Sequence, residues 1–217
     1  MPPRKQPAPK KAPRKSAAAI SKQAPAPAGK PALPRRGSPH PHAHAHAGKR
    51  SASCAVVTVS DSRTAADDHG GALACKLLEA AGHQIAHREI ITDDLERIWA
   101  RAAKLLNSGA FDLLLLTGGT GVSARDITPE AIRPLIDKEL IGFGELFRQL
   151  SFAEIGPAAF FSRAFAGVSG RALIVALPGS PAAVSLALEK LLLPELSHLA
   201  FELRKHDGVA HGARIHP

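Results

Sequence analysis

Short apolar segments recur along the chain from residue 54 onward, with polar or glycine-containing stretches between them. Residues 54–60 and 171–177 are rich in apolar and β-branched side chains. Residues 111–117 contain four consecutive leucines, which is typical of a strand buried on both faces. Residues 84–91 are less apolar. We therefore predict four strands, with residues 84–91 nearer to an edge of the sheet.

Segments with helical periodicity separate these strands. In residues 70–81 and 95–106, apolar side chains recur every three or four positions, as in a helix packed on one face. Gly82 is expected just past the end of the first helix. Thr92 is expected to cap the second, with Asp93 and the next residue in its first turn.

The second half of the chain has clear helix starts and one irregular region. Thr128, followed by proline, predicts a cap and a helix that runs to about residue 138. Ser180, also followed by proline, predicts another helix, which Pro194 kinks or breaks. Glycine and proline interrupt residues 139–170, and we expect short broken helices there.

Alternating strands and helices predict an α/β fold with three layers, α/β/α, around a mostly parallel sheet. Residues 51–205 are expected to form one domain, and residues 206–217 a flexible end. In such sheets ligands bind beyond the carboxyl ends of the strands. Polar loops follow three of the predicted strands, at residues 60–63, 118–126 and 178–180, and we expect these loops to form one site.

The loop at residues 118–126 has the composition of an anion cradle. It combines three glycines with hydroxyls, Arg125 and Asp126, and a helix follows it. Glycine lets backbone N–H groups approach a ligand closely, and a helix N-terminus favours negative charge. The loop lacks the lysine of a phosphate-binding P-loop. It matches a dinucleotide-binding pattern, with Glu139 at the distance of the ribose-binding acid, but the late helix start makes that match a coincidence. A tight turn without a ligand is the remaining alternative.

The basic charge of the chain is concentrated in residues 1–50. This segment holds 12 of the 28 Lys and Arg, no acidic residue and 11 of the 18 prolines. The remaining residues carry 16 basic and 19 acidic side chains, a formal charge of −3. Such a composition predicts a disordered tail. The tail either only promotes solubility or binds nucleic acid non-specifically through its phosphates.

Cysteine content and hydropathy indicate a cytoplasmic protein. Cys54 and Cys75 lie in apolar patterns without paired spacing, as expected for buried thiols in a reducing compartment. The sequence contains no run of about 18 apolar residues, so no membrane span is predicted.

The combined motifs resemble a known family. The segments TVSDSR at 58–63, DHGG at 68–71, TGGTG at 117–121, RDITPE at 125–130 and LPGS at 177–180 are similar to the molybdenum cofactor biosynthesis proteins MogA and MoaB. The segments GFGE at 142–145, FR at 147–148, EIG at 154–156 and SRA at 162–164 are closer to the MoaB branch. The resemblance covers roughly residues 52–203 and excludes the tail.

The resemblance implies a homo-trimer or homo-hexamer that binds molybdopterin. Active members transfer AMP from Mg-ATP to the terminal phosphate of molybdopterin, release pyrophosphate, and pass the product on for molybdate insertion. Asp126 matches the essential acid of the glycine loop and is expected to hold Mg²⁺, and Asp93 matches a second catalytic acid. The expected substrate-binding residues are Ser60, Asp61, Ser62, Gly118, Gly119, Thr120, Gly121, Ser123, Arg125, Gly142, Gly144, Ser162, Arg163, Pro178, Gly179 and Ser180.

The resemblance leaves more than one function open. His69 precedes Gly70 where the family commonly has a hydroxyl, and some MoaB-branch members have doubtful adenylyltransferase activity. The intact Arg125-Asp126 pair favours an active molybdopterin adenylyltransferase. The alternative is a molybdopterin carrier or scaffold of the same pathway that performs no catalysis.

Overall fold

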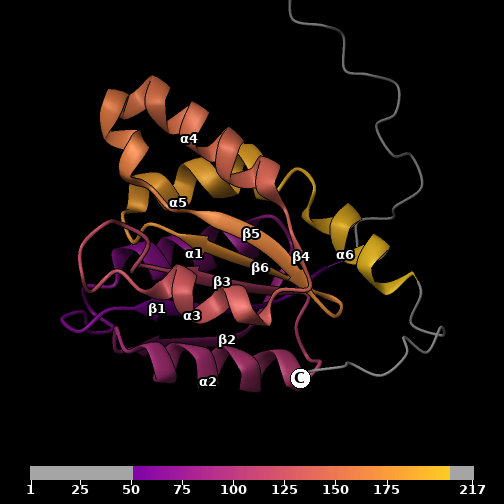
Figure 1. Ribbon diagram of the computed structural model, residues 1–217. Coiled ribbons are helices and arrows are strands. Elements are labelled where there is room, and N and C mark those ends of the chain that lie inside the picture. The colour runs from indigo at the N-terminus through magenta and orange to yellow at the C-terminus, as the bar shows by residue number, and fades with distance from the viewer. Residues whose placement is uncertain (1–50, 206–217) are drawn as a thin grey trace, which may run out of the picture. The chain divides into compact units, whose positions relative to one another are not determined.

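The computed structural model describes residues 51–205, so the expectations for residues 1–50 and 206–217 lie outside the described residues. Six strands form one sheet in the order β2-β1-β3-β6-β5-β4 (Figure 1). The parallel part contains β1 (Ser53–Val59), β2 (Gln84–Ile91), β3 (Leu113–Thr117) and β6 (Ala172–Leu177). The position of β2 at the edge of the sheet is as predicted.

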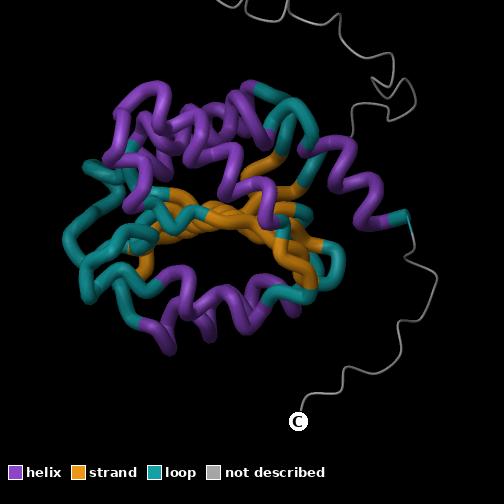
Figure 2. Tube along the Cα trace, turned by 45° about the horizontal axis from the view of Figure 1, so that its top comes forward, coloured by secondary structure: helices purple, strands orange, loops and turns teal. Residues whose placement is uncertain are grey.

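Helices cover both faces of the sheet, which confirms the three layers (Figure 2). One face packs against α1 (His69–Ala80), α4 (Ile141–Ile155), α5 (Pro181–Ala187), the π-helical segment Leu188–Leu192 and α6 (Leu196–Arg204). The other face packs against α2 (Leu95–Asn107) and α3 (Thr128–Ile132). Among the described residues, no helix is long and apolar enough to cross a membrane.

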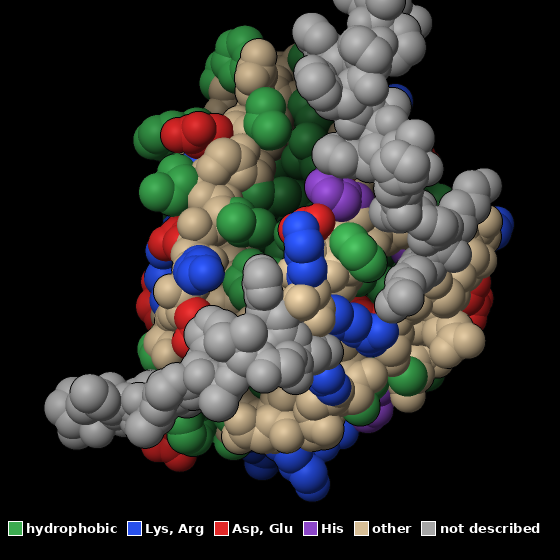
Figure 3. All heavy atoms as spheres, turned by 90° about the vertical axis from the view of Figure 1, so that its right-hand side faces the viewer, with side chains coloured by type: hydrophobic (Ala, Val, Ile, Leu, Met, Phe, Trp, Pro, Cys, Tyr) green, Lys and Arg blue, Asp and Glu red, His purple; other side chains and the backbone are tan. Residues whose placement is uncertain are grey.

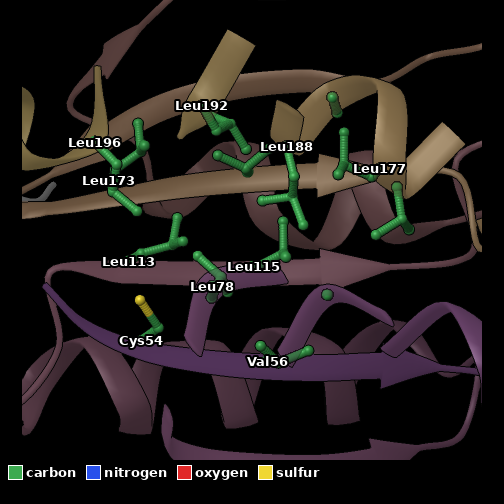
Figure 4. Packing of buried hydrophobic residues seen from close by; sticks show 14 of the residues in the cluster. Cys54, Val56, Leu78, Leu113, Leu115, Leu173, Leu177, Leu188, Leu192 and Leu196 are labelled. Atoms are coloured by element: carbon green, nitrogen blue, oxygen red, sulfur yellow. The ribbon is translucent and has the colours of Figure 1, made fainter. Parts of the chain in front are cut away.

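The alternation of side chains along β3 divides the core into two clusters. Leu113 and Leu115 point toward the face covered by α1, where they meet Leu78 and Leu188 (Figure 4). Their neighbours in sequence point to the opposite face, toward α2 and α3. Because each of the leucines of β3 is at most 1% exposed, the sequence prediction of a strand buried on both faces is confirmed.

Two strands were missed by the sequence prediction. β4 (Lys138–Glu139) and β5 (Phe165–Ser169) extend the sheet in antiparallel fashion beyond β6. β5 contains Ala166 and Gly167 in place of a β-branched run, so its sequence gave little strand signal. Gly167 is required by packing, because a Cβ atom there would lie 2.6 Å from Cγ2 of Ile136.

The helix predicted from Pro129 to about residue 138 ends early. α3 stops at Ile132 and a 3₁₀ turn, Arg133–Leu135, replaces its last part. Pro134 explains the difference, because proline lacks the N–H group that would continue the helix and restricts the residue before it. The early end of the helix leaves residues 138–139 extended, and they form β4.

In residues 139–170 the sequence prediction underestimated the length of a helix, because short broken helices were expected there. α4 is one continuous helix of 15 residues that contains Gly142 and Gly144. Gly144 is a packing residue, since a Cβ atom there would lie 2.8 Å from the carbonyl oxygen of Ala164. The helix ends at Gly156, whose φ of +62° glycine readily adopts, and a 3₁₀ segment, Gly156–Phe161, follows.

Helix caps agree with the sequence prediction in part. Ser180 caps α5, and Gly82 lies just past the end of α1 with a φ of +89°. Asp94, not Thr92, caps α2, because its carboxylate accepts the N–H of Arg97 at 2.9 Å. Asp93 therefore precedes the helix. Thr128 is the first residue inside α3 and does not cap it.

Candidate functional site

Three loops meet at the carboxyl ends of the parallel strands, as the sequence predicted. The loops after β1 and β3 lie together on the left of Figure 1, and the loop after β6 joins them. They enclose a cavity of about 460 Å³, which we call the strand-end pocket. Its lining residues are Val59, Ser60, Asp61, Ser62, Arg63, Asp93, Gly118, Gly119, Arg125, Gly179 and Ser180.

Two glycines at the start of the loop after β3 cannot be replaced without strain. Gly118 has a φ of +105°, and a Cβ atom on it would lie 2.2 Å from the carbonyl oxygen of Val59. Its N–H donates to the carbonyl of Leu177 at 2.9 Å. Gly119 has a φ of +63°. The loop therefore passes close between the ends of β1 and β6, which places its backbone on the wall of the pocket.

Thr128 fixes the other end of this loop. Its N–H donates to the carbonyl of Gly119 at 3.0 Å, and its buried hydroxyl donates to the carbonyl of Gly118 at 2.9 Å. The residue expected to cap α3 thus ties the start of the helix back to the glycines. This link between residues ten positions apart holds the loop in a narrow turn.

Asp126 closes the same loop on itself. Its carboxylate accepts the N–H of Ser123 at 2.7 Å, and its own N–H donates to the carbonyl of Ser123 at 3.0 Å. Burial alone would raise the pKa of Asp126, but hydrogen bonds from Ser123 and Gly121 and the charge of Arg163 outweigh burial and lower it. Asp126 is therefore a stable carboxylate next to the strand-end pocket, although it does not line that pocket.

Asp93 lines the strand-end pocket directly and lies in an acidic environment. Its N–H donates to Oδ1 of Asp61 at 3.1 Å, and Oδ2 of Asp61 pairs with Arg125 at 2.5 Å. Burial raises the pKa of Asp93, and the negative charges of Asp61 and Asp126 raise it further against the opposing charge of Arg125. Oδ1 of Asp93 is buried and has no hydrogen-bond partner among the described residues. This oxygen is suited to receive a donor or a cation supplied by a ligand.

The acids fit Mg²⁺ only as an ion shared with a phosphate. Within residues 51–205, no three acidic, histidine or cysteine side chains are grouped closely enough to hold a metal ion. Mg²⁺ commonly binds through one or two carboxylates, with water and substrate phosphates completing its coordination. Asp93 and Asp126, whose charges interact, are two carboxylates of the kind that such an ion uses.

Other expected site residues lie around two further hollows. Thr120, Gly121, Pro178 and Ser180 line a mostly apolar cavity of about 240 Å³ beside Phe147. Gly144, Ser162 and Arg163 line a hollow of about 400 Å³, which we call the arginine hollow because Arg133 and Arg148 also line it; Ser162 lines both. Gly142 lines none of these cavities, and a Cβ atom on it would meet nothing within 4 Å beyond its own helix backbone and chain neighbours.

Two residues near the site were not among the expected site residues, although both lie in motifs that carry the family resemblance. Nη1 of Arg63 would lie 2.6 Å from a Cβ atom on Gly179, so the guanidinium rests against that glycine in the pocket wall. Asp68 is 1% exposed and accepts hydrogen bonds from the hydroxyl of Thr58 and the N–H of Gly71, each at 2.9 Å. Asp68 also pairs with Arg88 at 3.1 Å. An aspartate just before a Gly-Gly helix start is a capping signal that could have identified it.

Comparison with known proteins agrees with the fold and shows the family of the chain. The family described as "Probable molybdopterin binding domain" matches residues 55–198. Molybdenum cofactor biosynthesis protein B from Bacillus cereus is 46% identical over 153 residues, which are 70% of this chain and 90% of the relative. The protein of the same name from Bacillus subtilis is 48% identical over 153 residues, with the same shares of the two chains.

Solved structures give the same result. A crystal structure of molybdenum cofactor biosynthesis protein B has a TM-score of 0.71 at 45% identity, and the match covers 73% of this chain and 99% of that one. The tungsten cofactor synthesizing protein MoaB from Pyrococcus furiosus has a TM-score of 0.64 at 34% identity, with 72% and 99% covered. A structure of MogA has a TM-score of 0.62 at 32% identity, with 70% and 99% covered.

Proposed function

Because this chain belongs to the probable molybdopterin-binding domain family and acts in molybdenum cofactor biosynthesis, we propose that it adenylylates molybdopterin with Mg-ATP. The supporting observation is the strand-end pocket, where the glycine loop faces Asp93 and lies next to Asp126. Phosphates bind well to loops whose backbone N–H groups are accessible at the ends of parallel strands.

The proposed reaction needs positioning and charge stabilisation more than covalent participation of the protein. An oxygen of the terminal phosphate of molybdopterin attacks the α-phosphorus of ATP. The new O–P bond forms as the bond to the bridging oxygen of the β-phosphate breaks, and pyrophosphate leaves with that electron pair. Bound Mg²⁺ would neutralise phosphate charge. Asp93 and Asp126 would hold the ion, while Gly118 and Gly119 would give the phosphates close access to the backbone.

We propose further that the chain forms a homo-oligomer and passes its adenylylated product to a molybdate-insertion protein. An exposed apolar surface supports the oligomer. Its residues on α4 and the following 3₁₀ segment are Ile141, Leu146, Phe152, Ile155, Phe160 and Phe161, each more than half exposed. Figure 3 shows hydrophobic side chains gathered at the top of the molecule, over these elements. Exposed apolar side chains grouped on neighbouring elements are typical of an interaction site.

A second candidate function is molybdopterin binding without AMP transfer. One observation favours it. The carboxylate of Asp126 accepts a hydrogen bond from its own loop, at Ser123, and does not line the strand-end pocket. In a carrier, Asp126 would serve only to shape the loop.

The decisive experiment follows AMP transfer by the full chain with molybdopterin, ATP and Mg²⁺. Asp126→Asn is compared with Asp94→Asn, a matched control next to Asp93 in which asparagine still caps α2. We expect adenylylated pterin from the unaltered protein and from the control, and a loss of at least about a hundredfold in Asp126→Asn. If the unaltered protein binds molybdopterin and forms no adenylylated product, the carrier function replaces the enzyme.

A further inference from the structure

Arg163 connects three separate parts of the glycine loop and its helix. It lies between the 3₁₀ segment Gly156–Phe161 and β5. Nε donates to the carbonyl of Gly121 at 2.6 Å, Nη2 donates to the carbonyl of Asp126, and Nη1 pairs with Glu130 in the first turn of α3. The backbone N–H of Arg163 donates to the carbonyl of Thr120 at 2.9 Å.

These contacts enclose the turn that carries Asp126. Inside the turn, the carboxylate of Asp126 holds the N–H of Ser123 at 2.7 Å. Outside it, one guanidinium joins the carbonyls of Gly121 and Asp126, which are the two ends of the same turn. A planar guanidinium can hold acceptors in several fixed directions at once, whereas an ammonium group cannot.

We propose that Arg163 is a positioning residue that holds the turn at residues 121–126, and through it Asp126, in place for the chemistry of the strand-end pocket. This role replaces the direct binding of substrate implied by the family resemblance, and it rests on the proposed function only for its catalytic consequence. Arg163 lines the arginine hollow and does not line the strand-end pocket, to which Asp93 belongs.

Removal of the Glu130 charge distinguishes positioning by Arg163 from direct binding of substrate. Its carboxylate pairs with Nη1 of Arg163. Burial alone would raise the pKa of Glu130, but the hydrogen bond and the charge of Arg163 outweigh burial and lower it. If Arg163 held an anionic substrate, Glu130 would compete with that substrate, and its removal would strengthen binding. If Arg163 positions the loop, Glu130 orients the guanidinium, and its removal weakens the same loop contacts.

Arg133 is a matched control on the same side of the loop. It lines the same hollow, pairs with Glu139 at 2.7 Å and lies over the ring of Phe165 at 4.9 Å. No hydrogen bond or ion pair joins it to residues 118–126 within the described part of the chain. Arg133→Lys thus changes an arginine of the hollow without disturbing a contact of the turn.

The test uses the full chain without ligand, in the variants Arg163→Lys, Glu130→Gln and Arg133→Lys. Amide exchange is measured at Ser123 and Asp126, whose N–H groups are both bonded within the turn. We expect exchange to accelerate at least about tenfold in Arg163→Lys, which loses charge-assisted hydrogen bonds, and less in Glu130→Gln. Arg133→Lys should leave the exchange of both amides unchanged.

Molybdopterin binding separates the two roles. Unchanged exchange in Arg163→Lys, together with tighter binding in Glu130→Gln, would overturn the proposal. If Arg163→Lys does not fold, Glu130→Gln alone decides between the two roles. Positioning predicts faster amide exchange in this variant, whereas direct binding of substrate by Arg163 predicts unchanged exchange. Since amide exchange needs no substrate, it tests the positioning role even if the unaltered protein transfers no AMP. In that case only the adenylyltransferase function fails.

Discussion

The N–H of Asp93 donates to Oδ1 of Asp61 at 3.1 Å, so the loop after β2 is tied to the loop after β1. The two carboxylates belong to residues 32 positions apart, yet both contribute to the charge of the pocket. Asp61 itself forms an ion pair with Arg125. The acidity of Asp93 is therefore set in part by a neighbour from another loop.

We expect Asp61→Asn to lower the pKa of Asp93, because one of the negative charges that raise it is removed. The amide oxygen of asparagine can still accept the N–H of Asp93, so the loop should keep its shape. NMR titration of the Asp93 carboxyl measures the change. Asp67→Asn serves as the control, since Asp67 is exposed in the same loop and its side chain bonds only to Thr64 among the described residues. An unchanged pKa in Asp61→Asn would show that the charge of Asp61 does not contribute to the raised pKa of Asp93.

Acid stability should depend on Asp126. Its pKa is lower in the folded protein than the ordinary value of 3.8. The stability that it contributes is complete above that ordinary value and is lost as the pH falls through the folded pKa. We expect Asp126→Asn to reduce the pH dependence of the unfolding free energy below about pH 4. Urea unfolding at a series of acidic pH values measures it. Glu145→Gln, an exposed change on α4, should leave the slope as it is.

Gly118→Ala should destabilise the fold by about 3 kcal/mol or more, because it adds backbone strain at a positive φ and a close contact with Val59. Gly142→Ala is the matched control. Gly142 lies in α4 with open space at its Cβ position, so alanine should be neutral or stabilise the helix by about 0.5 kcal/mol. Denaturant unfolding of both variants gives the comparison. Equal stability of the two variants would contradict the close approach of Gly118.

Asp112 should anchor the last helix to the sheet. It is 1% exposed, accepts the N–H of Ser53 at 2.8 Å and pairs with Arg204 of α6 at 2.5 Å. We expect Asp112→Asn to cost about 2 kcal/mol of unfolding free energy, since the buried carboxylate loses the charge that pairs with the partly exposed Arg204. Glu202→Gln, which affects only exposed contacts of the same helix with Lys205 and His198, should cost less than about 0.5 kcal/mol. Denaturant unfolding of the two variants measures both costs.

The sequence predicted the parts of the fold that are determined by local pattern. The leucines of β3, the cap at Ser180 and the glycine after α1 all depend on neighbouring residues, and the structure confirms them. β5 was missed because Ala166 and Gly167 give little strand signal, and Gly167 instead allows close packing against a distant residue, Ile136.

The same distinction applies to the site. The convergence of the three loops follows from the direction of parallel strands, so it was predictable. The contacts of Arg163 join it to residues up to 43 positions away, from residue 163 back to Thr120, and no local pattern reports such a pairing. The hydrogen bond that the Asp126 carboxylate accepts from the N–H of Ser123 likewise depends on the folded loop. The roles of these residues in binding and catalysis stay predictions until they are measured.

The hydrogen bond from Gly118 to the carbonyl of Leu177 has a consequence for synthesis on the ribosome. β6 lies between β3 and β5 in the sheet, but it is the last strand to be made. The glycine loop cannot complete its contacts before β6 is made, because the N–H of Gly118 donates to the carbonyl of Leu177 at the end of β6. A nascent chain that stops before Leu177 can therefore form β1, β2 and β3 without a pocket. Ligand binding should appear only after nearly the whole domain has emerged from the exit tunnel.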